Sequence, residues 1–191
     1  MNATNSKFLD SGFKEQEQFP RTFTVSFETL PGSKRSKTKV SINGTQVGDI
    51  IDDNSLEKDG YRFHDVFHYT FAALLGWSPC TRSMMKRKRK SNEQIDEIED
   101  GARATITEEA ISLLLFNEAK QANFFQSFDA VDSRLLDQIK NMTSSFEVSA
   151  RSKQEWKRAI LTGYSLFRDL VNNDGGKVHF DMNNRSAIYE R

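Results

Sequence analysis

Cysteine, net charge and long apolar runs are all scarce in this chain of 191 residues. The single cysteine, Cys80, excludes an internal disulfide, a CxxC redox pair and a cysteine-rich zinc site. The 27 Lys and Arg residues balance 27 Asp and Glu residues, which argues against a basic surface made for nucleic acid. No apolar run approaches the roughly 18 residues of a membrane span, and the polar N-terminal segment lacks the apolar centre of a secretory signal. We therefore expect a cytoplasmic protein that binds neither membrane nor nucleic acid.

Large aromatic side chains compensate for the modest apolar content. Only 37% of the residues are hydrophobic, but 15 Phe and 2 Trp concentrate apolar area in side chains that bury well. The chain is long enough to bury a core without disulfides, and its length fits one domain. We expect a flexible arm over residues 1–18, which are polar and patternless, and a single domain over residues 19–191.

The spacing of apolar residues predicts a helical core between two strand segments. Alternation of apolar and polar residues predicts a β-hairpin over about 22–43 and further strands over about 177–190. Between them, apolar residues at steps of three and four predict a helical core over about 61–171. Its main helices are expected over about 62–75, 93–122 and 152–171. The expected fold is therefore mainly α, a helical bundle with a small sheet formed by the two ends of the chain.

The acidic segment that opens the second of these helices carries the strongest chemical signal. On one continuous helix, Glu97, Asp100 and Glu108 fall within an arc of roughly 80°, with Glu109 at its side. Crowded carboxylates repel each other unless a cation lies among them, and Mg²⁺ prefers oxygen ligands. A solvated acidic face is the common alternative. The apolar residues around Glu108 and Glu109 favour partial enclosure, and so favour the metal.

A second group of candidate ligands precedes this segment. His64 and His68 lie one helical turn apart, with Asp65 beside the first of them. Such a histidine pair without a third ligand is more often a hydrogen-bonded pair than a metal site. We therefore rank Asp65 as a metal-binding carboxylate above the histidines as zinc ligands. Cys80 has no base nearby in the sequence and is interpreted as structural.

Five consecutive basic residues, 86–90, stand directly before the acidic segment. A solvated basic helix end, a nuclear-localisation signal and a nucleic-acid contact are the alternatives for such a run. Its position next to the acidic segment also suits a triphosphate, with a metal on the bridging oxygens and cationic side chains on the remaining charge.

Three blocks of the sequence, in this order, resemble the MazG-like nucleotide pyrophosphohydrolases of bacteria. They are DNSLEKDGYRFHDVFHYTFAALLGWSP, then KRKRKSNEQIDEIEDGARATITEEAISLLLF, then EWKRAILTGYSLFRDL followed by GGKVHFDMNNR. The resemblance covers roughly residues 48–191. It implies a helical bundle of the all-α NTP pyrophosphohydrolase type, often a homodimer. It also implies hydrolysis of a nucleoside triphosphate to a monophosphate and pyrophosphate with Mg²⁺, or with Mn²⁺ in its place.

The wider superfamily holds its metal with an ExxE motif on one helix and an ExxD motif on another. Here Glu97 and Asp100 have the ExxD spacing, whereas Ser112 and Arg62 stand where the pattern asks for further acids. The metal ligands that the resemblance implies are Asp65, Glu97, Asp100, Glu108 and Glu109, of which Glu97, Asp100 and Glu109 are the catalytic candidates. The implied substrate contacts are Lys88, Arg89, Lys90 and Arg103 for the phosphates and Asn54 for the base or sugar. The alternative function is a weak or inactive nucleotide-binding sensor or adaptor that acts with a partner protein.

Overall fold

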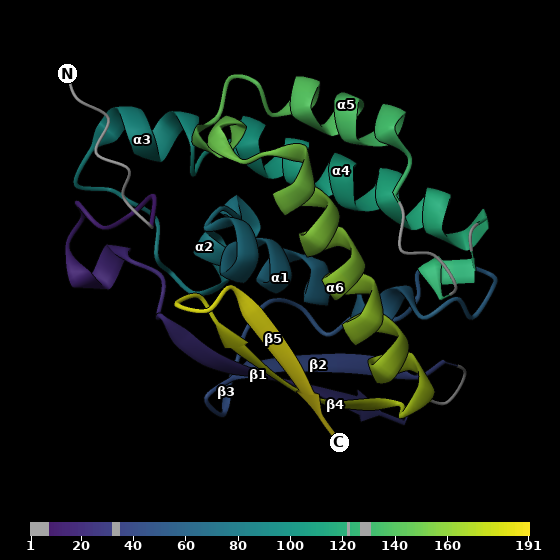
Figure 1. Ribbon diagram of the computed structural model, residues 1–191. Coiled ribbons are helices and arrows are strands. Elements are labelled where there is room, and N and C mark those ends of the chain that lie inside the picture. The colour runs from purple at the N-terminus through teal and green to yellow at the C-terminus, as the bar shows by residue number, and fades with distance from the viewer. Residues whose placement is uncertain (1–7, 32–34, 122, 127–130) are drawn as a thin grey trace.

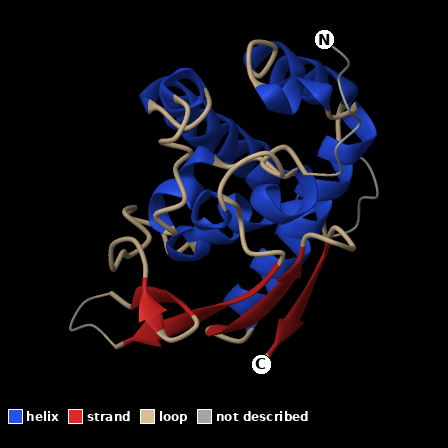
Figure 2. Cartoon of the chain, turned by 90° about the vertical axis from the view of Figure 1, so that its left-hand side faces the viewer, coloured by secondary structure: helices blue, strands red, loops and turns tan. Residues whose placement is uncertain are grey.

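The computed structural model describes residues 8–31, 35–121, 123–126 and 131–191, and in this part of the chain helices cover one face of a five-stranded sheet (Figure 1 and Figure 2). The strands are β1 (Thr22–Leu30), β2 (Lys37–Ile42), β3 (Thr45–Gln46), β4 (Gly175–Asp181) and β5 (Ser186–Glu190). The helices are α1 (Asp65–Leu75), α2 (Pro79–Met84), α3 (Glu93–Ile98), α4 (Ala102–Gln121), α5 (Ser133–Met142) and α6 (Lys153–Asn172). Short 3₁₀ helices are η1 (Glu15–Glu17), η2 (Tyr61–Phe63), η3 (Asn123–Phe125) and η4 (Glu147–Ala150).

The sheet joins the two ends of the chain. Its strand order is β3-β2-β1-β4-β5, and all neighbours are antiparallel. Val25 of β1 stands opposite Ile42 of β2 on one side and Val178 of β4 on the other. Because side chains alternate along a strand, Phe23, Val25 and Phe27 all reach the helices and are buried there. The apolar residues that alternate in the sequence thus form the sheet side of the hydrophobic core.

Helix α1 is the centre of the molecule. Each of its residues from Val66 to Leu75 is buried, because the sheet lies below it and α6 and α4 pack against its other sides (Figure 1). Tyr69 meets the ring of Phe23 on the sheet, and Phe67 stacks on Phe167 of α6. A helix that is apolar nearly all round is expected at such a position. Polar side chains on α1 are therefore confined to its first two turns.

Gly163 is the point of closest approach between α6 and α1. A Cβ atom at this position would lie 2.9 Å from Cδ1 of Phe67. On an exposed helix face, replacing glycine by alanine would stabilise by about 1 kcal/mol. Here we expect Gly163→Ala to lower the free energy of unfolding by about 1–3 kcal/mol, because the buried ring must shift. Urea denaturation tests this, with the exposed Ser165→Ala on the same helix as control. A Gly163→Ala variant at least as stable as the wild type would contradict the prediction.

The expectation of a mainly α fold is wrong, and the fold is mixed α/β. About 49% of the described residues are helical and about 17% are in strands, which form a single antiparallel sheet. The strands were expected as a minor addition to a bundle. They instead form a complete layer, because four of them share one continuous face and three of these contribute buried Val, Ile or Phe. This sheet buries the side of α1 that the other helices leave uncovered.

The single helix expected over about 93–122 is also wrong. The chain forms α3 and α4, separated by residues 99–101. At Gly101 a Cβ atom would lie 2.0 Å from the carbonyl oxygen of Glu97, so only glycine fits this turn. Glu99 and Asp100 turn inward at the break and are buried. The carboxylates of this segment therefore do not form one stripe.

Part of the segment expected as an arm contacts the helices. Residues 1–7 of that expectation lie outside the described residues. Within residues 8–18, Asp10 is buried and accepts hydrogen bonds from the Phe19 amide and from Arg82 of α2, at 2.8 and 3.1 Å. Within the described residues, no helix is both long and apolar enough to cross a membrane.

Candidate functional site

Titratable side chains of α1, α2 and α4 meet at the N-terminal end of α1. Helix α1 supplies Asp65 and His68, and His64 immediately precedes it. Helix α4 supplies Glu108, which is fully buried, and Glu109, whose side chain is 48% exposed. We call His64, Asp65, His68, Glu108 and Glu109 the α1–α4 cluster. It brings together three of the five carboxylates predicted as metal ligands.

Both carboxylate oxygens of Glu108 accept hydrogen bonds from within the protein. Its Oε1 accepts from Ser78 Oγ at 2.6 Å and lies 2.9 Å from Nδ1 of His68. Its Oε2 accepts from the backbone N–H of Cys80 at 2.8 Å. Ser78 is also the N-cap of α2, and Pro79 follows at the first helical position, so the local sequence fixes this end of the helix. Glu108 therefore orients its neighbours, and together with His68 and Cys80 it forms a second group of potential metal ligands.

In both histidines, Nδ1 lies within hydrogen-bond distance of a partner and Nε2 faces the other residues of the cluster. Nδ1 of His68 meets Glu108, while its Nε2 is buried, has no hydrogen-bond partner among the described residues and lies 3.6 Å from Oε2 of Glu109. Nδ1 of His64 lies 3.0 Å from the carbonyl oxygen of Tyr61, and the two rings stack. Its Nε2 lies 3.4 Å from Oδ1 of Asp65. One ligand atom from each of His64, Asp65 and His68 lies within 4.8 Å of the others.

The carboxylates around His68 favour its protonated, cationic form, and a metal ion at the cluster would have to displace this proton. Burial alone would lower the pKa of His68, but the adjacent Glu108 and Cys80 raise it well above its ordinary value. The contact with His68 lowers the pKa of Glu109 to about 2, so this carboxylate is ionised at neutral pH. Burial lowers the pKa of His64 and keeps its imidazole neutral. Burial, followed by the charge of Glu108, raises the pKa of the Cys80 thiol, which is therefore not an activated nucleophile.

Asp100 and Arg89 form a buried ion pair away from the cluster. Nη2 of Arg89 lies 2.7 Å from Oδ1 of Asp100, and the backbone N–H of Arg89 donates to Oδ2, also at 2.7 Å. Nη1 and Nη2 of Arg89 also contact the carboxylate of Glu147 at 2.9 and 2.8 Å. Asp100 belongs to no group of three potential metal ligands among the described residues. The sequence predicted a metal contact for Asp100 and a phosphate contact for Arg89, and in the structure these two side chains contact each other.

Glu99 lies next to this ion pair and accepts hydrogen bonds from the Glu147 amide. Burial raises its pKa from 4.5 to about 7. The folded state therefore binds a proton that the unfolded state releases, and stability should fall as the pH rises from about 5 to 7. We expect the free energy of unfolding of Glu99→Gln to fall less over this pH range than that of the wild type, by on the order of 1 kcal/mol. Urea unfolding at about pH 5 and pH 7 measures this difference. Parallel pH profiles of stability for the variant and the wild type would contradict the prediction.

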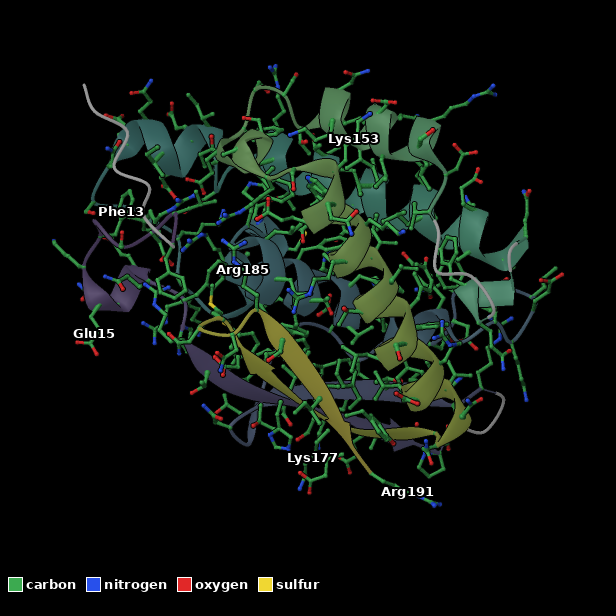
Figure 3. The ribbon with its side chains drawn as sticks, in the orientation of Figure 1. Phe13, Glu15, Lys153, Lys177, Arg185 and Arg191 are labelled. Carbon is green, nitrogen blue, oxygen red and sulfur yellow. The ribbon has the colours of Figure 1, made fainter. Side chains whose placement is uncertain are left out.

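The remaining predicted residues lie on the surface. Glu97 is exposed on α3, Arg103 is exposed on α4, and Asn54 is exposed in the loop before η2. Lys88 and Lys90 line an open pocket of about 440 Å³ together with Lys86. The basic run thus divides, with Arg89 directed inward and these lysines outward. Arg185, at the tip of the β4–β5 hairpin (Figure 3), pairs with Glu155 at the start of α6.

Sequence reasoning missed the residues that orient the cluster. Ser78 and the Tyr61 carbonyl hold Glu108 and His64 through hydrogen bonds, and neither was a candidate. The histidines were candidates but were ranked below Asp65, because no third ligand was visible beside them. The i, i+1, i+4 spacing of His64, Asp65 and His68 was the available signal, since it places three ligands on one turn.

The comparisons with known proteins bear on the chain as a whole. A family model described as the MazG C-terminal domain matches residues 4–191. No curated protein and no solved structure matches the chain. The family match confirms the resemblance to MazG-like proteins, and it extends over the N-terminal strands, which had been the less characteristic part. Because it covers nearly the full sequence, the chain belongs to the MazG C-terminal domain family.

Proposed function

We propose that this protein hydrolyses a nucleoside triphosphate to a monophosphate and pyrophosphate, with a divalent cation at the α1–α4 cluster. The observation that carries this proposal is a pocket that adjoins the cluster through Tyr61. The pocket has a volume of about 260 Å³, and Tyr61 both lines it and stacks on His64. A triphosphate at the cluster would therefore have space for its nucleoside next to it.

Helix α4 connects the two parts of this site. Glu109, Leu113 and Phe116 are spaced by four and three residues and so share one face of the helix. Glu109 belongs to the cluster, and the two apolar residues line the pocket. Leu113 is 51% exposed although it is large and apolar. A nucleobase would cover it, and the polar side chains of Asn54 and Asn117 in the same pocket could bind the base or sugar.

The fit of Mg²⁺ to the cluster is partial. Both oxygens of Glu108 already accept hydrogen bonds, so Asp65 and Glu109 are the carboxylates that offer oxygens to the ion. One or two carboxylates suffice for a Mg²⁺ ion that arrives with substrate phosphates. The nearest other donors, however, are imidazole nitrogens, which Mg²⁺ does not favour. A bound cation would supply charge neutralisation and a more acidic water. Asp65 and Glu109 would hold it and orient the phosphates.

Pyrophosphate detection across the common ribo- and deoxyribonucleoside triphosphates, with Mg²⁺ and with Mn²⁺, tests the proposal. We expect release from at least one of them, with a raised KM in Asn54→Ala if the pocket takes the nucleoside. Lys177→Ala, on the distant β4 strand (Figure 3), is the control and should leave KM unchanged. No product from any nucleotide in folded protein would contradict hydrolysis.

A nucleotide-binding sensor or adaptor is the second candidate. The observation that favours it is the reduced set of free carboxylates, because Glu97 and Asp100 belong to no group of potential ligands among the described residues and both oxygens of Glu108 accept hydrogen bonds. Isothermal titration calorimetry separates the two functions. Tight nucleotide binding without pyrophosphate release would support the sensor.

A further inference from the structure

We propose that His64, Asp65 and His68 form a binding site for a divalent transition-metal ion, with Zn²⁺ best suited to the donors. This inference deepens the proposed function, because it concerns the cation of the same cluster. It begins from an anomaly. Within the described part of the chain, Nε2 of His68 is buried without a hydrogen-bond partner, in a side chain that is 1% exposed. A buried polar atom of this kind carries a desolvation cost unless something binds it.

The orientation of both histidines is the one that metal sites use. A metal-binding histidine usually donates its other ring N–H to a carboxylate or a backbone carbonyl, which fixes the tautomer and directs the free nitrogen at the metal. Here Nδ1 of His68 meets the carboxylate of Glu108, and Nδ1 of His64 meets the carbonyl of Tyr61. Both Nε2 atoms are therefore left for the cluster.

The spacing of the donors agrees with one shared ion. Ligands at about 2.0–2.2 Å in tetrahedral geometry lie about 3.4 Å from one another. Nε2 of His64 lies 3.4 Å from Oδ1 of Asp65, and all three residues have a ligand atom within 4.8 Å of the other two. A small closure of the side chains would complete the site. Three protein ligands leave a further position open, as in catalytic zinc sites.

The donor set also selects the class of metal. Two imidazole nitrogens with one carboxylate suit Zn²⁺, Fe²⁺ and related ions, whereas Mg²⁺ takes oxygen ligands. Glu109 lies beside His68 at 3.6 Å and is half exposed, so it can contact the ion or a water in the open position. Cys80, whose Sγ lies 3.5 Å from Oε1 of Glu109, belongs with His68 and Glu108 to a second group of potential ligands.

Cobalt substitution tests the site without any need for turnover. The full chain is stripped with a chelator and titrated with Co²⁺, whose visible absorption bands report nitrogen ligands and a low coordination number. We expect one ion per chain, displaced by Zn²⁺ and not by an equal concentration of Mg²⁺. His64→Gln and Asp65→Asn should each weaken binding at least tenfold. His179→Gln, the same change on the open face of the sheet, is the matched control and should bind normally.

A folding check and one further variant guard against a loss of binding that is caused by unfolding. His64 and Asp65 are partly exposed, so their variants are expected to fold, and circular dichroism checks this. Glu108→Gln keeps the shape of the side chain that orients His68, and it should weaken Co²⁺ binding by about 10- to 100-fold. Co²⁺ bands that are absent, or that are unchanged in His64→Gln, would overturn the site. Pyrophosphate release without such binding would leave the proposed function in place and refute only this inference.

Discussion

Asp65→Asn and Glu109→Gln are each expected to lower pyrophosphate release by at least about 100-fold, the usual cost of removing a charge that stabilises a transition state. Asp65 stands at the first position of α1, and Glu109 faces the cluster from α4. Neither is fully buried, so their amide variants should fold. The melting temperature and the initial rate at saturating nucleotide measure the two properties separately.

The matched control for this prediction is Glu97→Gln. Glu97 was expected from the sequence to be both a ligand and a catalytic residue, yet it is exposed on α3 and belongs to no group of potential ligands among the described residues. We expect full activity in this variant. Loss of activity in Glu97→Gln together with normal activity in Asp65→Asn would favour the ExxD hypothesis and contradict the α1–α4 cluster.

Local patterns in the sequence predicted the elements around the site well. The alternation that starts at Phe23 corresponds to β1, and the apolar run after Arg62 corresponds to α1. Both patterns report which faces are buried, and burial depends on few neighbours in the sequence. The fold class failed for a different reason. A sheet formed by the two chain ends was expected, and β1 pairs with β4 accordingly, but no local pattern expresses how much of the helical core this sheet covers.

The candidate site shows the same division. His64, Asp65 and His68 lie on one helical turn, so their proximity could be predicted from spacing alone. Glu108 reaches His68 across 40 positions of sequence, and no spacing rule predicts that contact. Charge patterns predicted the site less well than residue spacing did, because acidic and basic residues that are close in sequence can pair with each other as well as with a ligand. In the run of basic residues before α3, Arg89 pairs with Asp100 inside the protein, whereas Lys88 and Lys90 line a pocket at the surface.

Arg89→Met is expected to lower the free energy of unfolding by about 3–5 kcal/mol, the largest stability effect that we predict. Arg89 is fully buried, and the change leaves the carboxylates of Asp100 and Glu147 without their shared cation. For a chain of this size the melting temperature should fall by roughly 10 °C. Lys88→Met makes the same substitution one residue away from Arg89, on a side chain directed outward, and should change stability by less than about 0.5 kcal/mol.

A double-mutant cycle decides whether the pair is structural or functional. If Arg89 and Asp100 stabilise the fold through each other, Arg89→Met combined with Asp100→Leu should regain part of the loss, because Asp100 no longer remains as a buried carboxylate without Arg89. The recovery should be incomplete, because Glu147 still loses Arg89 and Arg82 loses Asp100. The double variant should then bind nucleotide as the wild type does. If Arg89 instead binds phosphate and Asp100 a metal, stability should change little in the single variants while nucleotide affinity falls. The buried, multiply hydrogen-bonded geometry of the pair leads us to expect the first result.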